Sequence, residues 1–192
     1  MVASGRPLLE CICASGELWQ LVWNQLNNPN MSEEPIKIFY SWECIEIACM
    51  NMYAAINESG FKPDYIVGLT RGGLVPAVIF SHKFNVPLHT LNVSLRDNHS
   101  KERRLWMIED ALHSKNILIV DDINDSGSTI NTIKANWEEA FPGDWHKIWH
   151  NNVRFAVIDD NMGSAVRTDY CNFSIDKNKN NNWIVYPWEN NE

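Results

Sequence analysis

The sequence is short of basic charge, of long apolar runs and of N-terminal targeting signals. Its 16 Lys and Arg residues are outnumbered by 24 Asp and Glu residues, for a formal net charge of −8. Nucleic-acid and anionic-membrane surfaces need clustered Lys and Arg, so neither partner is expected. No apolar run approaches the ~20 residues that a membrane helix requires, and the basic start and apolar stretch of a signal peptide are missing. We therefore expect a soluble cytoplasmic protein.

The sequence also lacks paired cysteine motifs and the common nucleotide-binding patterns. The cysteines are odd in number and have no paired C-x-x-C spacing, so we expect free thiols rather than a disulfide framework or a zinc site. They are Cys11, Cys13, Cys44, Cys49 and Cys171. The chain contains neither G-x-G-x-x-G nor the Walker pattern, which ranks a generic nucleotide-binding α/β protein last among the functions considered.

What the chain does contain is an alternation of apolar runs and amphipathic segments. Its 192 residues are enough for one well-buried domain. We predict strands at residues 36–40, 65–69, 88–93, 116–121 and 153–158. We predict helices at residues 41–59, 73–84 and 127–140, the first capped by Ser41 and the second with Pro76 in its first turn. This order predicts an α/β fold with a mainly parallel twisted sheet flanked by helices, and ligands at the carboxyl ends of its strands.

The first thirty residues differ from the rest of the chain. Residues 16–26 have the pattern of a short amphipathic helix, and Asn27-Asn28-Pro29-Asn30 is a breaker. Two interpretations stay open. Residues 1–30 are either an N-terminal extension or a native helix packed on the domain that occupies residues 31–192.

The strongest functional signal is the string Ile-Leu-Ile-Val-Asp-Asp-Ile-Asn-Asp-Ser-Gly-Ser-Thr at residues 117–129. It predicts a buried strand that ends in two carboxylates, then a short turn and a Ser/Gly cluster that opens a helix. The N–H groups and positive dipole end of such a helix suit one phosphate monoester. Because carboxylates repel phosphate, Asp121 and Asp122 should face sugar hydroxyls or a metal ion, and a phosphorylated ribose supplies both faces. The alternative is an ordinary turn in which Asp125 or Ser126 only caps the helix.

This string resembles the phosphoribosyl pyrophosphate (PRPP) signature of type I phosphoribosyltransferases. Thr-Arg-Gly-Gly-Leu-Val-Pro at residues 70–76 looks like the pyrophosphate-binding loop of bacterial xanthine-guanine phosphoribosyltransferases. Trp-Ile-Val-Tyr-Pro-Trp-Glu at residues 183–189 is similar to their purine-pocket segment. The likeness spans residues 36–189. It implies the type I phosphoribosyltransferase fold with a small C-terminal hood, Mg²⁺ as cofactor, PRPP and a 6-oxopurine as substrates, and a homo-oligomer, either dimer or tetramer.

The resemblance also implies roles for individual residues. Asp121 and Asp122 would hold the ribose hydroxyls, directly or through Mg²⁺, and Asp125 would manage the proton near purine N7. The 5′-phosphate would be bound by Ser126, Gly127, Ser128 and Thr129. The leaving pyrophosphate would be contacted by Thr70, Arg71 and Gly72. The purine would be bound by Trp183, through stacking, and by Ile184.

Three further features have competing interpretations. Trp183 is either the stacking ring or simply a core aromatic. Lys101, Arg103 and Arg104 either close over PRPP as part of a mobile lid at residues 94–104 or belong to an ordinary solvated loop. For the histidines His146 and His150, which lack further ligands nearby in the sequence, an interface or a surface helix is favoured over a metal site.

Two departures from the family leave the choice of base open. Residues 153–160 offer no lysine where the xanthine-guanine enzymes have one for the purine 6-oxo group, and Arg154 is the nearest cation. The flexible loop opens with Ser94-Leu95 rather than Ser-Tyr. The rivals are a phosphoribosyltransferase for another base and a non-catalytic PRPP-binding regulator, although the chain offers no basic DNA-binding module.

Overall fold

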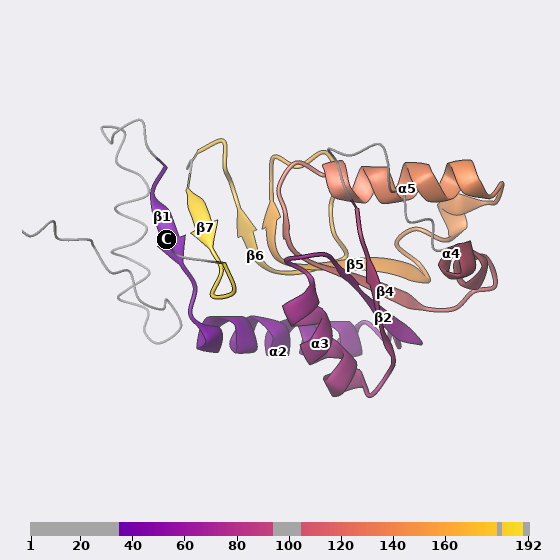
Figure 1. Cartoon of the computed structure of the whole chain (residues 1–192), viewed down its shortest axis with the longest axis horizontal. Helices are drawn as coiled ribbons and strands as arrows, with labels where there is room; N and C mark the ends of the chain where they lie inside the picture. Colours follow the sequence, from indigo (N-terminus) through magenta and orange to yellow (C-terminus); the bar gives the residue numbers. More distant parts are fainter. Residues whose placement is uncertain (1–34, 94–104, 180–181, 190–192) are drawn as a thin grey trace, which may run out of the picture. The chain divides into compact units, whose positions relative to one another are not determined.

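The computed structural model describes residues 35–93, 105–179 and 182–189 of the chain (Figure 1). It divides into two compact units, one formed by residues 1–47 and 177–192 and the other by residues 48–176. We call them the terminal unit and the sheet unit, in each case meaning their described residues. The expected boundary at residue 30, like the proposed extension at residues 1–30, lies outside the described residues.

The sheet unit is built on five parallel strands in the order β3-β2-β4-β5-β6. The strands are β2 (Tyr65–Leu69), β3 (Leu88–Leu91), β4 (Ile117–Asn124), β5 (Val153–Asn161) and β6 (Tyr170–Ile175). Every neighbouring pair runs parallel. This pairing confirms the predicted α/β fold with a parallel sheet. The physical reason is that apolar runs such as Ile-Leu-Ile-Val in β4 can be buried on both faces only between layers of helices.

Helices cover both faces of this sheet. They are α2 (Trp42–Glu58), α3 (Leu74–Phe84), α4 (Leu105–Leu112) and α5 (Ser128–Ala140), together with the 3-10 turn η1 (Trp145–Lys147). The buried side chains of α4 and α5 pack with Val67, Ile119 and Phe155 on one sheet face. Figure 1 shows α3 on the opposite side from α4 and α5. There α3 lies close enough to β2 that a Cβ at Gly68 would come within 2.9 Å of the Ala77 Cβ.

Several boundaries differ from the sequence prediction. The strand β4 runs on through the acidic residues to Asn124, because Ile123 and Asn124 still pair with Asp159 and Asp160 of β5. The strand β3 ends at Leu91 instead of residue 93. The helix α4 and the edge strand β6 were not predicted. Pro76 lies in the first turn of α3, as expected.

The terminal unit pairs the two ends of the domain. Its strands β1 (Lys37–Phe39) and β7 (Trp183–Val185) form a separate two-stranded parallel sheet, so the predicted strand at residues 36–40 exists but does not join the main sheet. Ser41 caps the start of α2, since its Oγ accepts from the Cys44 N–H at 3.2 Å. The Tyr186 and Trp188 rings stack at 4.9 Å. In the described part of the chain, every helix is too short or too polar to cross a lipid bilayer.

Candidate functional site

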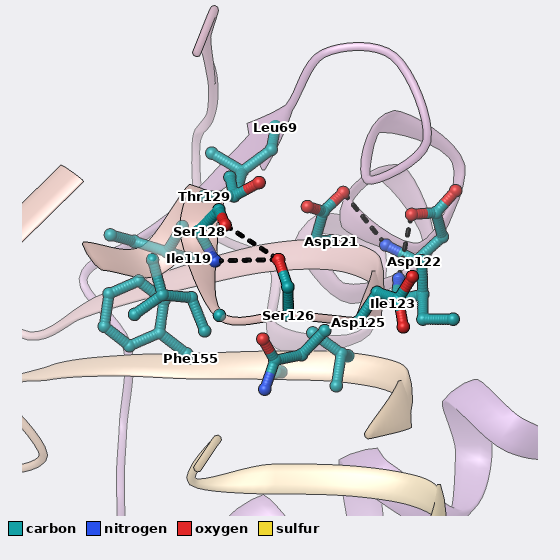
Figure 2. A pocket seen from close by; sticks show the side chains of 15 residues that line it. Leu69, Ile119, Asp121, Asp122, Ile123, Asp125, Ser126, Ser128, Thr129 and Phe155 are labelled. Atoms are coloured by element: carbon teal, nitrogen blue, oxygen red, sulfur yellow. Dashed lines mark hydrogen bonds between the residues drawn. The ribbon is translucent and has the colours of Figure 1, made fainter. Parts of the chain in front are cut away.

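A cavity of about 360 Å³ opens where β4 passes into α5 (Figure 2). Its walls come from the end of β2, from β4 and the turn after it, from the middle of β5 and from the first turn of α5. The lining residues are Leu69, Ile119, Asp121, Asp122, Ile123, Asn124, Asp125, Ser126, Gly127, Ser128, Thr129, Ile130, Phe155, Ala156 and Val157. The cavity therefore lies at the carboxyl ends of parallel strands, where the sequence predicted a ligand.

Two adjacent carboxylates project from β4 into this region. Asp121 Oδ1 accepts from the Asp122 N–H at 3.0 Å, and Asp122 Oδ1 accepts from the Ile123 N–H at 2.8 Å (Figure 2). Burial, and then the Asp122 carboxylate beside it, raise the pKa of Asp121 well above its ordinary value, although N–H groups of Asp122 and Gly73 act in the opposite direction. The pair thus concentrates negative charge in a poorly solvated place, which favours a cation or hydroxyl donors as ligand.

The turn before α5 and the first turn of that helix supply hydrogen-bond donors for an anion in the same cavity. Gly127 has φ +84°, a conformation that glycine adopts without strain, and it turns the chain into α5 at Ser128. The Ser126 and Ser128 hydroxyls lie 2.8 Å apart, and the Ser128 N–H donates to Ser126 Oγ at 3.3 Å (Figure 2). The first N–H groups of this thirteen-residue helix have no helical partner, so hydroxyls and N–H groups converge where a phosphate would be held.

The loop after β2 packs closely against the carboxylates. A Cβ at Gly72 would come within 1.8 Å of Asp122 Oδ2, and a Cβ at Gly73 would come within 2.1 Å of the Val120 carbonyl oxygen. Only glycine allows this approach. The predicted pyrophosphate loop is therefore brought beside Asp122 through Gly72. Among the described residues, none of Thr70, Arg71 and Gly72 lines the cavity itself.

A segment that the sequence analysis did not identify, Asn161 to Ser164, forms hydrogen bonds with the turn that bears Asp125. Asn161, at the end of β5, donates to Asp125, and Ser164 Oγ donates to Asn124 Oδ1 at 3.2 Å. Asn124 in turn donates to Asp160 Oδ1 at 2.6 Å. One signal was available: three polar residues, Asp159 to Asn161, follow an apolar strand at the same sheet edge as Asp121.

Other predicted residues fall elsewhere. Trp183 and Ile184 lie on β7 of the terminal unit, and their purine-binding role stays a prediction. Trp183 is 57% exposed, so the alternative that it is a core aromatic is wrong. Lys101, Arg103 and Arg104 lie outside the described residues.

Arg154 is the cation nearest in sequence to the place where the xanthine-guanine enzymes have their purine-binding lysine. It does not lie at the cavity end of β5. Its side chain donates to the Asn151 carbonyl at 2.9 Å and to the Tyr170 hydroxyl, and its guanidinium lies 4.5 Å from the Phe61 ring centroid. It therefore ties β5 to β6 and to the end of α2. Arg154 is the second residue of β5 and lies seven positions before the carboxyl end of the strand. Strand alternation alone did not reveal its contacts.

Of the two histidines, His150 has polar partners in the structure. His150 bonds Asp169 through Nδ1 at 2.9 Å and Lys134 through Nε2 at 3.0 Å. Across the residues that are described, no group of three or more His, Cys, Asp or Glu side chains is placed to hold a metal ion.

Comparisons with known proteins point to one family. The family model described as "Phosphoribosyl transferase domain" matches residues 35–190. The chain is 25% identical to a hypoxanthine-guanine phosphoribosyltransferase of Schizosaccharomyces pombe, over 81% of this chain and 90% of that protein. It is 23% identical to a xanthine-guanine phosphoribosyltransferase of Idiomarina loihiensis, over 80% and 87%. The crystal structure of a purine phosphoribosyltransferase from Pyrococcus horikoshii matches at TM-score 0.59 and 25% identity, over 81% and 95%.

Proposed function

The chain belongs to the phosphoribosyltransferase domain family, and we propose that it is a purine phosphoribosyltransferase of purine salvage. It transfers the 5-phosphoribosyl group of PRPP to hypoxanthine, guanine or xanthine and releases pyrophosphate. The single observation that supports this most strongly is the cavity in which two strand-borne carboxylates share one wall with a helix N-terminus rich in hydroxyls. A phosphorylated ribose matches both, because its hydroxyls donate to carboxylates and its phosphate accepts from N–H and O–H groups.

The proposed reaction breaks the bond between ribose C1′ and the pyrophosphate oxygen and forms a bond from C1′ to the purine nitrogen. The electrons of the broken bond leave with pyrophosphate, and the base loses one N–H proton. In this proposal Asp121 and Asp122 hold the ribose hydroxyls and stabilise positive charge at C1′, while Asp125 manages the proton near N7. Ser126, Gly127, Ser128 and Thr129 bind the 5′-phosphate. Thr70, Arg71 and Gly72 bind the pyrophosphate, and Trp183 and Ile184 bind the purine.

Mg²⁺ fits the donor set of this cavity. Carboxylate oxygens are the ligands that Mg²⁺ prefers, and it commonly takes only one or two from the protein and the rest from water and substrate phosphates. Asp121 and Asp122 supply such a pair, and a cation would offset the negative charge of two adjacent carboxylates. When bound, Mg²⁺ would neutralise charge on the departing pyrophosphate. A cytoplasmic location and a homo-oligomeric state belong to the same proposal.

The test is pyrophosphate release from PRPP and Mg²⁺, with hypoxanthine, guanine, xanthine, adenine, uracil and orotate offered one at a time. We expect turnover with at least one 6-oxopurine. Asp125→Asn should lower kcat by about 10²- to 10⁴-fold. Asp144→Asn is the matched control, because Asp144 pairs with Lys147 at 2.6 Å in the η1 turn and is absent from the cavity wall.

The other outcomes assign the protein differently. Tight PRPP binding in calorimetry with no turnover on any base would overturn the proposal in favour of a PRPP-binding regulator. Turnover confined to adenine, uracil or orotate would keep the PRPP site and replace the base. Equal loss in Asp125→Asn and Asp144→Asn would show that the effect at Asp125 is not specific to the cavity.

A further inference from the structure

We propose that Asn161 is a positioning residue that holds the Asp125 carboxylate in its working orientation, an inference that rests on the proposed function. Asn161 is the last residue of β5 and is 8% exposed. Its Nδ2 donates to the Asp125 main-chain carbonyl at 2.9 Å and to Asp125 Oδ1 at 3.3 Å. One amide therefore contacts both the backbone and the side chain of the residue assigned to the purine proton.

The orientation of the Asn161 amide is set by a second contact. The Gly163 N–H donates to Asn161 Oδ1 at 3.1 Å. Since an N–H group needs an acceptor, this contact requires the amide oxygen to face Gly163 and the amide nitrogen to face Asp125. The –NH₂ group has two protons, so one can serve the carbonyl of Asp125 and the other its carboxylate.

The residues that follow Asn161, from Ser164 to Val166, contact the residues on either side of Asp125. The Ala165 N–H donates to the Ser126 carbonyl at 3.2 Å. Asn124, on the other side, donates through Nδ2 to the Val166 carbonyl at 2.7 Å. A Cβ at Gly127 would come within 2.9 Å of Ser164 Oγ, so the two segments lie in direct contact. The backbone at Asp125 is thus held from both sides, and Asn161 adds a donor to the side chain itself.

That donor matters because Asp125 is exposed on the cavity wall. An exposed carboxylate rotates among several conformers, and a general acid or base works only within about 2.6–3.2 Å of the atom whose proton it handles. A buried, pre-oriented amide restricts the conformers without changing the net charge of the site. Loss of that restriction should lower kcat while leaving the binding of PRPP, which uses other residues, largely unchanged.

The experiment compares Asn161→Ala, Asn161→Asp and Asn172→Ala in steady-state kinetics with the best base. We expect kcat to fall about 10- to 100-fold in Asn161→Ala, and further in Asn161→Asp, with the KM for PRPP within about 3-fold of wild type. Asn161→Asp keeps the shape but replaces the donor by a carboxylate beside a carboxylate. Asn172→Ala, which removes an exposed amide bonded to Asn51 at 3.1 Å, should leave kcat unchanged. Wild-type kcat in Asn161→Asp would overturn the inference, because a merely space-filling side chain tolerates that change.

A double-mutant cycle separates an action through Asp125 from an independent one. In an Asp125→Ala background, Asn161→Ala should cause no further loss of kcat, because the side chain it positions is already gone. The same fold-loss in both backgrounds would overturn the positioning role. Wild-type protein that turns over no base would overturn the proposed function and this inference with it. Wild-type turnover with unimpaired Asn161 variants would overturn only the inference.

Discussion

The two ends of the sheet unit use polar side chains for different purposes. At the amino ends of the strands, polar groups close main-chain gaps: Asp64 accepts from the Asn116 N–H at 2.7 Å, and Asn152 donates to the Ala111 and Lys115 carbonyls at 2.9 and 3.0 Å. At the carboxyl ends, Asp121 and Asp122 accept one N–H each from their own strand and also form the wall of a cavity. The first arrangement satisfies groups that burial would otherwise penalise.

The second arrangement costs stability. Burial and the neighbouring Asp122 raise the pKa of Asp121, which means that the folded state disfavours the charged form of this carboxyl group. A fold selected only for stability would avoid two adjacent acids there. The carboxyl ends of the strands are therefore organised around a ligand and the amino ends around the fold.

The largest effect is expected from a methyl group added to the loop beside β4. In Gly73→Ala the new Cβ would come within 2.1 Å of the Val120 carbonyl oxygen, which is main chain in a central strand and cannot move away. We expect a loss of about 3 kcal/mol or more in the free energy of unfolding, measured by urea denaturation. The control at the amino ends is Gly143→Ala, whose Cβ would meet Leu112 Cδ2 at 2.6 Å.

Leu112 can rotate away, so Gly143→Ala should cost about 1 kcal/mol or less. Neither glycine has a positive φ, and the comparison therefore isolates steric contact from backbone conformation. Equal losses in the two variants would mean that the loop after β2 does not press on β4 as closely as these distances require.

The next prediction compares the effects of two substitutions on stability and on activity. Asn152→Ala removes the amide that donates to the Ala111 and Lys115 carbonyls and should cost about 1–3 kcal/mol of unfolding free energy, with kcat per folded molecule unchanged. Asp122→Asn should do the reverse: kcat falls about 10²-fold or more, while stability is kept or increased because one of two adjacent carboxylates is gone. Urea midpoints and kcat measured on the same preparations check both. A stability loss in Asp122→Asn as large as that in Asn152→Ala would remove the contrast between the two ends.

The site was predictable from the sequence where its residues are contiguous. Residues 121–129 line the cavity as one stretch, because a strand, a turn and a helix start that follow one another in the chain also follow one another in space. The Asn161–Asp125 contact spans 36 residues. The polar run at Asp159 to Asn161 signals the sheet edge but does not identify Asp125 as the partner of Asn161. It depends on β4 and β5 being neighbours in register, which only the folded sheet decides.

The fold was predictable where burial is complete. The strand β2 has the predicted bounds because all five of its residues are buried and apolar or glycine. The edge strand β6 mixes Tyr170, Cys171 and Phe173 with Asn172 and Ser174, so its pattern is weak. The helix α4 is only eight residues long and follows a polar stretch that hides its start. The extension of β4 from Asp122 to Asn124 was missed because acidic residues usually end strands, and here pairing with β5 overrides that preference.

The smallest effect concerns a cation near the amino end of β5. Lys134 lies with its ammonium 3.0 Å from His150 Nε2 and 5.7 Å from the centroids of both the Trp149 and Phe155 rings. Burial lowers the pKa of Lys134 from its ordinary 10.5, while Asp169 and Glu138 partly oppose that shift. Between the lowered value and 10.5 the unfolded chain binds more protons than the folded chain, so the contribution of this group to stability rises as pH rises.

The Lys134→Met variant lacks this titration. We therefore expect the urea midpoint of the variant to equal or exceed that of wild type at neutral pH, and the difference to shift toward wild type as pH approaches 10.5. A pH-independent difference would mean that the aromatic rings and Asp169 compensate the ammonium fully, and that charge burial lowers stability at the carboxyl ends of the sheet alone.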